Sequence, residues 1–303
     1  MAALALLVPG GNGQLGQDLV AAAPEGSLVH APGSGDLDVR QAGSVVRAVD
    51  ALVVAAKEAG LPPIVINAAA YTAVDAAESA QDAAYAVNAD GPRLLAAVCS
   101  SRQVPIVHVS TDYVFPGDKA GPYEVDDQVG PKSVYGLTKL AGEESVLRSG
   151  AESWVVRTAW VYGAHGASNF VKAITRLEGE RATLSVVDDQ RGSPTWSADL
   201  AAGLLELAGR IVSGNAPRAR TLHCTGGGET TWYGFARAIF EELGADPDRV
   251  RPCTTAEFPR PAKRPENSVL SPASWTGAGL TPLQPWRDAL AKAFPSFQEV
   301  ARR

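Results

Sequence analysis

Three side chains near the middle of the chain have the types and the spacing needed to protonate a ketone oxygen. Tyr135 and Lys139 are four residues apart, so a helix would place both on one face, and Ser133 is a suitable N-cap for that helix. Thr111 follows the β-branched run 105–109, which predicts a strand, and therefore lies at the carboxyl end of that strand. A phenol, an ammonium and a hydroxyl could thus converge on one ligand.

These three groups suit hydride transfer to a ketone, because the alkoxide that forms needs a proton and a partner for its developing charge. A free tyrosine has a pKa of about 10, which is too high for efficient proton exchange at neutral pH. A nearby ammonium favours the phenolate, so Lys139 is expected to lower the pKa of Tyr135, and it could also hold a cofactor ribose. Thr111 would share the carbonyl oxygen with Tyr135. A tyrosine and a lysine at this spacing also pack on each other in ordinary helices, so the assignment depends on a cofactor site.

A glycine-rich turn at the beginning of the chain is the candidate cofactor site. The apolar run 4–8 predicts a strand, and the turn after it reads as G-x-x-G-x-x-G from Gly10 or as G-x-G-x-x-G from Gly11, with Gly13 and Gly16 in both. In either register, glycines allow a tight turn and a close approach of the backbone to a pyrophosphate, whose charge faces the N-terminus of the next helix. We therefore favour dinucleotide binding over a plain loop.

The end of the second predicted strand, residues 27–31, should contact the adenosine ribose. An acidic residue there would select the 2′-hydroxyl of NADH, but none is present, and Asp36 and Asp38 come later. Ser34 would tolerate a 2′-phosphate without attracting it strongly, because no arginine stands in this cluster. The sequence therefore leaves the choice between NADH and NADPH open.

Strands and helices alternate five times up to residue 162, which is typical of a doubly wound, parallel α/β sheet of the Rossmann type. Beyond Gly163 the alternation loosens and prolines accumulate. We expect a dinucleotide-binding domain at 1–160, to which 187–225 returns, and a smaller C-terminal substrate-binding lobe made of 161–186 and 226–303. Besides the helix that Ser133 begins, the expected helices are 48–59, 82–99, 169–177, 199–208 and 232–243, and the expected later strands are 64–66, 153–162, 183–187 and 221–225.

Composition excludes several classes of protein. The 303 residues carry a net charge of -6 and no long Lys/Arg run, which argues against nucleic-acid binding as the main task. No apolar run approaches the ~20 residues that a membrane span needs. Cys99, Cys224 and Cys253 form no C-x-x-C pair, which indicates reduced thiols in a cytoplasmic protein. The four histidines stand alone at wide spacing, so no catalytic zinc site is expected, and neither a G-x-S-x-G elbow nor a P-loop is present.

Several motifs together resemble those of the dTDP-4-dehydrorhamnose reductase family, a branch of the extended short-chain dehydrogenase/reductases. The glycine turn alone would not separate this family from sugar-nucleotide epimerases. The stretches S-T-D-Y-V-F-P-G from Ser110 and D-D-Q-R-G-S-P-T from Asp188 are far more specific. The other matching stretches are N-A-A-A-Y-T-A-V-D from Asn67, V-Y-G-L-T-K-L-A-G-E from Val134, R-T-A-W-V-Y from Arg157, Asn169-Phe170, and R-P-E-N-S from Arg264.

The resemblance implies reduction of the C4 ketone of dTDP-4-dehydro-β-L-rhamnose to dTDP-β-L-rhamnose by NADPH or NADH, in nucleotide-sugar biosynthesis. It implies that Tyr135 donates the proton, that Lys139 holds the ribose, and that Thr111 helps to set Tyr135 and the carbonyl. Contacts with the dTDP-4-keto-6-deoxy sugar fall to Thr111, Asp112 and Trp160. The implied cofactor contacts are Gly10, Gly13, Gln14, Leu15, Gly16, Asp38, Val39, Ala68, Ala69, Ala70, Tyr135 and Lys139.

Some members of this family bind Mg²⁺ through carboxylates at a dimer contact. Asp18 matches one of these ligands, but Ala198 stands where another is expected, so the ligand set for Mg²⁺ is incomplete and no metal site is assigned. The sequence is compatible with a monomer or a homodimer. Two other functions remain open: reduction of another dTDP-4-keto deoxysugar, and service as a non-catalytic, NADP-binding regulatory subunit of the methionine adenosyltransferase β type. The intact Tyr135, Lys139 and Thr111 speak against the regulatory subunit.

Overall fold

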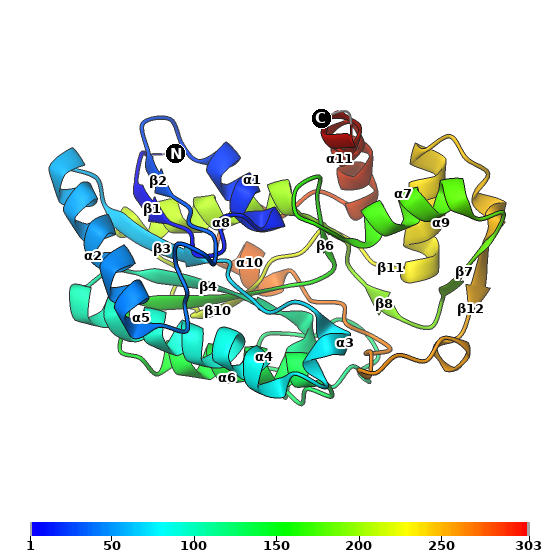
Figure 1. Ribbon diagram of the computed structural model, residues 1–303, viewed down its shortest axis with the longest axis horizontal. Coiled ribbons are helices and arrows are strands. Elements are labelled where there is room, and N and C mark those ends of the chain that lie inside the picture. Colours follow the sequence, from blue (N-terminus) through cyan, green and yellow to red (C-terminus); the bar gives the residue numbers. More distant parts are fainter. Residues whose placement is uncertain (1, 302–303) are drawn as a thin grey trace.

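A six-stranded parallel sheet forms the centre of the computed structural model, which describes residues 2–301 (Figure 1). Its strands are β1 (Ala5–Leu7), β2 (Leu28–His30), β3 (Pro63–Asn67), β4 (Ile106–Thr111), β5 (Ser153–Thr158) and β10 (Thr221–His223). Their spatial order is β2-β1-β3-β4-β5-β10, and every neighbouring pair is parallel. The order reverses between β1 and β3, which is where ligands bind in doubly wound sheets. The predicted fold class is confirmed.

Helices cover both faces of this sheet, as Figure 1 shows. One face is covered by α1 (Gln14–Ala22) and α8 (Ser197–Val212), and the other by α2 (Ala42–Ala59), α5 (Gly91–Arg102) and α6 (Val134–Leu147). Successive strand residues alternate between the two cores, so that Leu6 packs with Leu19 and Leu204 while Leu7 packs with Val49. Because both faces are buried, the strands read as continuous apolar runs rather than as alternating patterns.

The helix predicted at 82–99 is interrupted by a π-helical turn. After the short α3 (Val74–Ala77), the chain forms α4 (Gln81–Tyr85), the π-helical turn Ala86–Asp90, and then α5. Pro92 gives the physical reason, because it has no amide hydrogen to donate to the carbonyl of Asn88. The Gly91 amide bonds instead to the carbonyl of Ala86, five residues back. The prediction of one regular helix was therefore wrong.

The strand predicted at 153–162 is also divided. β5 ends at Thr158, and Trp160 takes a positive φ of 46°, which turns the chain away from the central sheet. β6 (Val161–Tyr162) then pairs with β9 (Thr195–Trp196) in a separate two-stranded sheet. The apolar pattern continues through the break, which is why one strand was predicted there.

The remaining elements form a smaller group, to the right of the central sheet in Figure 1. Three helices and one short sheet pack around one apolar core, in which Phe235 and Ile239 are fully buried, and a second short sheet belongs to the same group. The helices are α7 (Phe170–Glu180), α9 (Trp232–Glu242) and α11 (Trp286–Ala301), and the sheets pair β7 (Leu184–Val187) with β12 (Val250–Cys253) and β8 (Arg191–Gly192) with β11 (Thr230–Thr231). Neither β12 nor α11 was expected, because Pro252 and Pro295 stand inside them.

Part of the C-terminal tail returns to the central sheet. α10 (Ala273–Gly277) packs on β10, and Trp275 and Leu280 belong to the core that α1 and α8 cover. The other expected helices are present with shifted ends: the helix expected at 48–59 begins at Ala42, and the one expected at 199–208 is the longer α8. Across residues 2–301, we find no helix of the length and apolarity that crossing a membrane requires.

Candidate active site

One cavity of about 980 Å³ lies at the carboxyl ends of β1, β3, β4 and β5. It brings together every residue that the sequence assigned to the cofactor, the chemistry or the substrate. These lining residues are Gly10, Gly13, Gln14, Leu15, Gly16, Asp38, Val39, Ala68, Ala69, Ala70, Thr111, Asp112, Tyr135, Lys139 and Trp160. Further lining residues that the sequence did not single out include Arg40, Tyr113, Thr158, Trp232 and Arg264.

The glycine turn closes one end of the cavity. Gly10 has a φ of 84°, and a Cβ at this position would lie 2.8 Å from the amide nitrogen of Ala69, so only glycine fits between the ends of β1 and β3. Gly13 is the N-cap of α1, and no side chain caps this helix. The first amides of α1 therefore have no side-chain acceptor and suit an anion at the helix N-terminus. The residues present fit a dinucleotide pyrophosphate.

Gln14 joins this turn to the smaller group of elements. Its side-chain amide donates to the carbonyl of Val161 at 3.2 Å, and its oxygen accepts from the side chain of Asn169 at 2.8 Å. Asn169 also donates to the carbonyl of Gly163 and caps α7 by accepting from the amide of Lys172. The Asn169-Phe170 motif thus has a definite structural role, which is to fix α7 against the glycine turn.

The end of the cavity where the sequence predicts the adenosine contains an arginine that the sequence did not single out. Arg40 lines the cavity together with Ser34 and Asp38, and its guanidinium pairs with both carboxylate oxygens of Asp38 at 2.8 Å. The hydrogen bond from Arg40 holds the pKa of Asp38 below its usual value. No arginine stands in the sequence cluster 30–35, but Arg40, a few residues later, lines the same cavity as Ser34.

α6 presents Tyr135 to the cavity. Ser133 caps this helix as predicted, accepting from the Gly136 amide at 3.2 Å. A Cβ on Gly136 would lie only 2.2 Å from the carbonyl oxygen of Tyr113, so this glycine lets α6 pack against the end of β4. Desolvation of the phenol raises the pKa of Tyr135 to about 12, and the nearby Thr111 hydroxyl opposes this shift. The direction is opposite to the one expected from Lys139, because desolvation dominates and the ammonium is bonded elsewhere.

Lys139 is held by β4 rather than by the Tyr135 phenol. Its buried ammonium donates to the carbonyl of Val109 at 2.7 Å and lies 3.4 Å from the Nε2 of His108. Burial lowers the pKa of Lys139 to about 8, although the charge of Glu143 opposes this. Burial, followed by the charge of Lys139, holds the pKa of His108 well below its usual value, so this ring is neutral. His108 therefore positions the lysine, whereas the sequence indicated only a structural histidine.

Thr111 and Asp112 form a bonded pair at the end of β4. The Thr111 hydroxyl donates to Oδ1 of Asp112 at 2.8 Å and accepts from the amide of Tyr113 at 3.2 Å. Asp112 is 3% exposed, and its Oδ2 has no hydrogen-bond partner among the residues that the structure describes. Burial raises the pKa of Asp112 to about 6, and the hydrogen bond from Thr111 opposes the shift.

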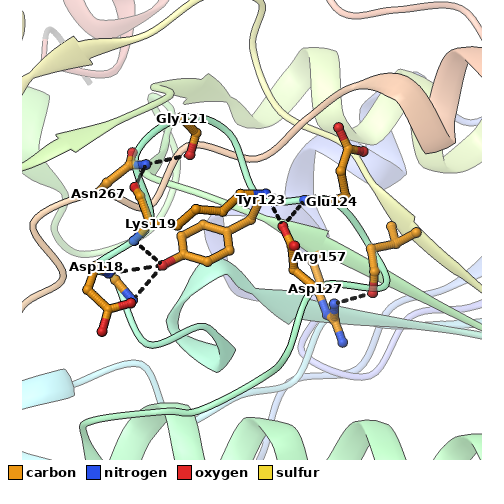
Figure 2. Close-up of polar contacts among 10 residues, drawn as sticks. Asp118, Lys119, Gly121, Tyr123, Glu124, Asp127, Arg157 and Asn267 are labelled. Atoms are coloured by element: carbon orange, nitrogen blue, oxygen red, sulfur yellow. Dashed lines mark hydrogen bonds and ion pairs between the residues drawn. The ribbon is translucent and has the colours of Figure 1, made fainter.

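The loop between β4 and α6 is fixed from within and from the C-terminal tail (Figure 2). The Tyr123 hydroxyl accepts from three consecutive amides, those of Gly117, Asp118 and Lys119, at 2.9–3.0 Å. The Asn267 side chain donates to the carbonyls of Lys119 and Gly121 at 2.8 and 2.7 Å. Part of the R-P-E-N-S motif therefore braces the loop that leads from Thr111 to Tyr135.

Arg264, the first residue of the same motif, reaches the cavity from the tail. Its two terminal nitrogens pair with the two carboxylate oxygens of Asp75 at 2.8 and 2.9 Å, and one of them also donates to the carbonyl of Ala262. Its Nε makes no hydrogen bond to any residue of the range 2–301. The edge of the guanidinium that carries Nε is therefore available to a ligand.

An aromatic pair closes the far side of the cavity. Trp160 stacks on Trp232 with ring centroids 3.5 Å apart and planes 5° apart, and Phe170 packs on Trp232 at 4.5 Å. Gly192 is needed beneath this pair, because a Cβ there would lie 2.3 Å from the Trp160 ring. The stack accounts for the uncommon backbone conformation of Trp160. Trp232 looks like an ordinary core position in the sequence, and only the structure places it here.

Asp18, which matched a metal ligand in the resemblance, lies behind the glycine turn. It accepts a hydrogen bond from Ser197, and His165 lies 3.8 Å away. Burial raises the pKa of Asp18. Within the described part of the chain, no three His, Cys, Asp or Glu side chains are grouped so that they could hold a metal ion. Cys99, Cys224 and Cys253 are free thiols.

A doubly wound sheet whose glycine turn shares a cavity with Tyr135 and Lys139 defines a Rossmann-type protein of the short-chain dehydrogenase/reductase class. The model of one family, the RmlD substrate binding domain, matches residues 4–299, and the chain belongs to this family. The resemblance noted from the motifs is thereby confirmed.

Similar proteins agree with this membership over nearly the whole chain. A dTDP-4-dehydrorhamnose reductase of Streptomyces griseus is 46% identical over 96% of this chain and 93% of its own length. A probable dTDP-4,6-dihydroxy-2-methyloxan-3-one 4-ketoreductase of Streptomyces antibioticus is also 46% identical, over 96% of this chain and 95% of its own. Among solved structures, dTDP-4-dehydrorhamnose reductase from Bacillus anthracis str. Ames in complex with NADP superimposes with a TM-score of 0.86 and 32% identity, over 97% and 99% of the two chains.

Proposed function

We propose that this protein reduces the C4 ketone of dTDP-4-dehydro-β-L-rhamnose to dTDP-β-L-rhamnose with NADPH or NADH. The observation that carries the proposal is that Tyr135, Lys139 and Thr111 share one cavity with an uncapped glycine turn. The names of similar proteins at 46% identity support the substrate, and the NADP complex of the Bacillus anthracis enzyme supports the cofactor.

Three residues of the chain have separate roles in this reaction. The reduced nicotinamide, when bound, supplies the hydride. The Tyr135 hydroxyl gives its proton to the substrate oxygen, and the Thr111 hydroxyl holds that oxygen in place by a hydrogen bond. Lys139, anchored on the carbonyl of Val109, holds the cofactor ribose. The high pKa of Tyr135 keeps the phenol protonated until the alkoxide forms.

Arg264 supports an anionic substrate. Of the cationic side chains that line the cavity, Arg40 belongs to the adenosine end and Lys139 to the reacting centre, so Arg264 is placed to meet a second anion. A planar guanidinium edge fits phosphate oxygens, as a nucleoside-diphosphate sugar requires. Asp112 and Trp160 are then the contacts for the sugar itself.

The domain arrangement is part of the proposal. We assign residues 1–160 and the returning segment 187–225 to the dinucleotide, and 161–186 and 226–303 to the substrate. The cofactor is either NADPH or NADH, since Arg40 could attract a 2′-phosphate while its partner Asp38 would repel one. We also propose a cytoplasmic location and a monomer or homodimer, which light scattering after gel filtration would separate.

The direct test is NAD(P)H oxidation followed at 340 nm with enzymatically prepared dTDP-4-dehydro-β-L-rhamnose. We expect turnover and a product identical to dTDP-β-L-rhamnose by NMR. A folded protein that binds NADP but gives no turnover would overturn the proposal and would favour the regulatory subunit.

A second candidate is the reduction of another dTDP-4-keto deoxysugar in the same site. The Streptomyces antibioticus relative, which carries a different ketoreductase name at the same 46% identity, favours this candidate. Competing the two keto sugars in one assay separates the candidates, because the ratio of their kcat/KM values measures the preference directly.

A further inference from the structure

Three buried polar side chains form a row that leads from the end of β3 to the reacting centre. Asn67 of β3, His108 of β4 and Lys139 of α6 are each at most 2% exposed. The Nδ2 of Asn67 lies 3.0 Å from the Nδ1 of His108, and the Nε2 of the same ring lies 3.4 Å from the Nζ of Lys139. Of the three, only Lys139 lines the cavity, so the other two can act on a ligand only through it.

The orientation of the Asn67 amide determines which ring nitrogen of His108 carries the proton. The Oδ1 of Asn67 accepts a hydrogen bond from the backbone amide of Ala69 at 3.1 Å, so the other end of the side chain, which faces His108, is the NH2 group. An NH2 group of this kind only donates, and the Nδ1 of His108 must therefore accept. A protonated ring would direct a second N–H against the NH2 group, so the ring is neutral and its one N–H is on Nε2, facing Lys139.

We propose that Asn67 and His108 are positioning residues for Lys139, which together direct the Nε2–H of the imidazole at the lysine nitrogen. The inference rests on the proposed role of Lys139 at the cofactor ribose and extends this role to two side chains outside the cavity. A neutral amine accepts the N–H with its lone pair, whereas an ammonium has no lone pair and faces the positive end of the N–H dipole. The ring therefore favours the amine, whose own hydrogens are left for the Val109 carbonyl and for the ribose.

The charges around Lys139 leave room for the ring to act. Burial is the main cause that lowers the pKa of Lys139 to about 8, and the charge of Glu143 on the same helix opposes it. Arg157 of β5 pairs with both carboxylate oxygens of Glu143 at 2.8–3.2 Å, which weakens the effect of that charge on the lysine. The other titratable groups of the reacting centre are Tyr113, Tyr135 and Asp112, and burial shifts the pKa of each toward its neutral form.

The first test observes the ring proton directly. In protein labelled with ¹⁵N-histidine, the NMR shifts of the two ring nitrogens show which of them carries the hydrogen, and a His108→Gln variant assigns the His108 signals among the four histidines. We expect a neutral ring with its hydrogen on Nε2 between about pH 5 and pH 9. A hydrogen on Nδ1, or an imidazolium in this range, would overturn the inference.

The second test reverses the ring. In Asn67→Asp the carboxylate still accepts from the Ala69 amide, but it also accepts from a hydrogen on Nδ1 of His108, so that Nε2 becomes an acceptor for the Lys139 ammonium. The affinity for NADPH, measured by fluorescence titration, should fall above an inflection near pH 8 in the wild type, where Lys139 loses its charge, and above about pH 9 or higher in the variant. A purely structural role of Asn67 would instead weaken binding at every pH without moving the inflection, and this result would contradict the inference.

Two further variants separate the ring from the added charge. Asn67→Leu removes the donor without adding a charge and should move the inflection in the same direction; a shift in Asn67→Asp alone would assign the effect to the new carboxylate and overturn the inference. If Asn67→Leu does not fold, the ¹⁵N measurement on the wild type still decides. Asn215→Asp adds the same charge at an exposed position and should keep the wild-type inflection. Failure of the reductase function itself would appear differently, as NADPH binding without NAD(P)H oxidation by the wild type.

Discussion

At the scale of single residues, burial favours the neutral form of each reacting group. Desolvation raises the pKa of Tyr135 to about 12 and that of Asp112 to about 6, and it lowers that of Lys139 to about 8. These shifts share one main cause, which is the burial of each group away from water. The Tyr135 phenol is therefore protonated at neutral pH and can donate, while its raised pKa makes it a weaker acid than a free tyrosine.

Tyr135→Phe tests the donor directly. The change removes one oxygen and little contact area, so kcat should fall by two to four orders of magnitude, the usual contribution of a general acid. Affinity for NADPH, measured by fluorescence titration, should stay within a few-fold of wild type. The exposed Tyr85→Phe provides the matched control. Near-normal turnover of Tyr135→Phe would refute the assignment.

Asp112→Asn should also change how stability depends on pH. The folded chain keeps the Asp112 proton up to about pH 6, whereas an unfolded aspartate loses it near pH 4, so folding takes up a proton between these values. The free energy of unfolding of the wild type therefore falls as pH rises through this window. Above pH 6 this decrease is complete.

The amide in Asp112→Asn does not titrate, so this variant should be more stable than wild type at pH 7, by up to about 3 kcal/mol, and should lose this advantage below pH 4. Urea unfolding at pH 4, 5, 6 and 7 measures the difference. A constant difference across these pH values would show that the carboxyl is not perturbed by burial.

At the scale of elements, the position of α6 depends on glycines that allow close approach. A Cβ on Gly142 would lie 2.2 Å from the carbonyl oxygen of Asn88, in the π-helical turn. Gly142→Ala should thus cost about 1–3 kcal/mol by overpacking, which exceeds the helical preference for alanine of up to about 1 kcal/mol. Gly209→Ala, in α8 with open space around it, should instead stabilise the protein. Urea midpoints distinguish the two; equal effects would mean that α6 can shift freely.

The sequence predicts elements well where the signal is local. The strand and turn before α1 and the Ser133 cap of α6 follow from glycines, a β-branched run and a capping residue within a few positions. The π-helical turn is harder to predict, because the missing amide hydrogen of Pro92 opposes a strong helical pattern in the residues around it. The break at Trp160 depends on a stack with Trp232, 72 positions later in the numbering. Arg264 was likewise visible only as part of a motif, because its partner Asp75 is remote in sequence.

At the scale of the whole molecule, the cavity lies where the central sheet meets the smaller group of elements. Side-chain hydrogen bonds join these two parts of the molecule, including those between Gln14 and Asn169 and between Arg264 and Asp75. The first bond ties the cofactor turn to α7, and the second ties the C-terminal tail to the segment after β3. Both halves of the site therefore depend on contacts between distant parts of the chain.

Arg264 and Arg260 allow a matched test of this arrangement, because both lie near Asp75 but only Arg264 lines the cavity. Loss of a charge-assisted hydrogen bond to a phosphate costs about 1.5–3 kcal/mol, so Arg264→Leu should raise KM for the nucleotide sugar about 10- to 100-fold. The affinity for NADPH should not change, since the cofactor contacts come from other residues. Arg260→Leu, whose side chain is half exposed and 4.0 Å from Asp75, should leave both constants near wild type. If the two variants raise KM equally, Arg264 acts only by holding the tail in place, and the phosphate of the substrate must be bound by other groups.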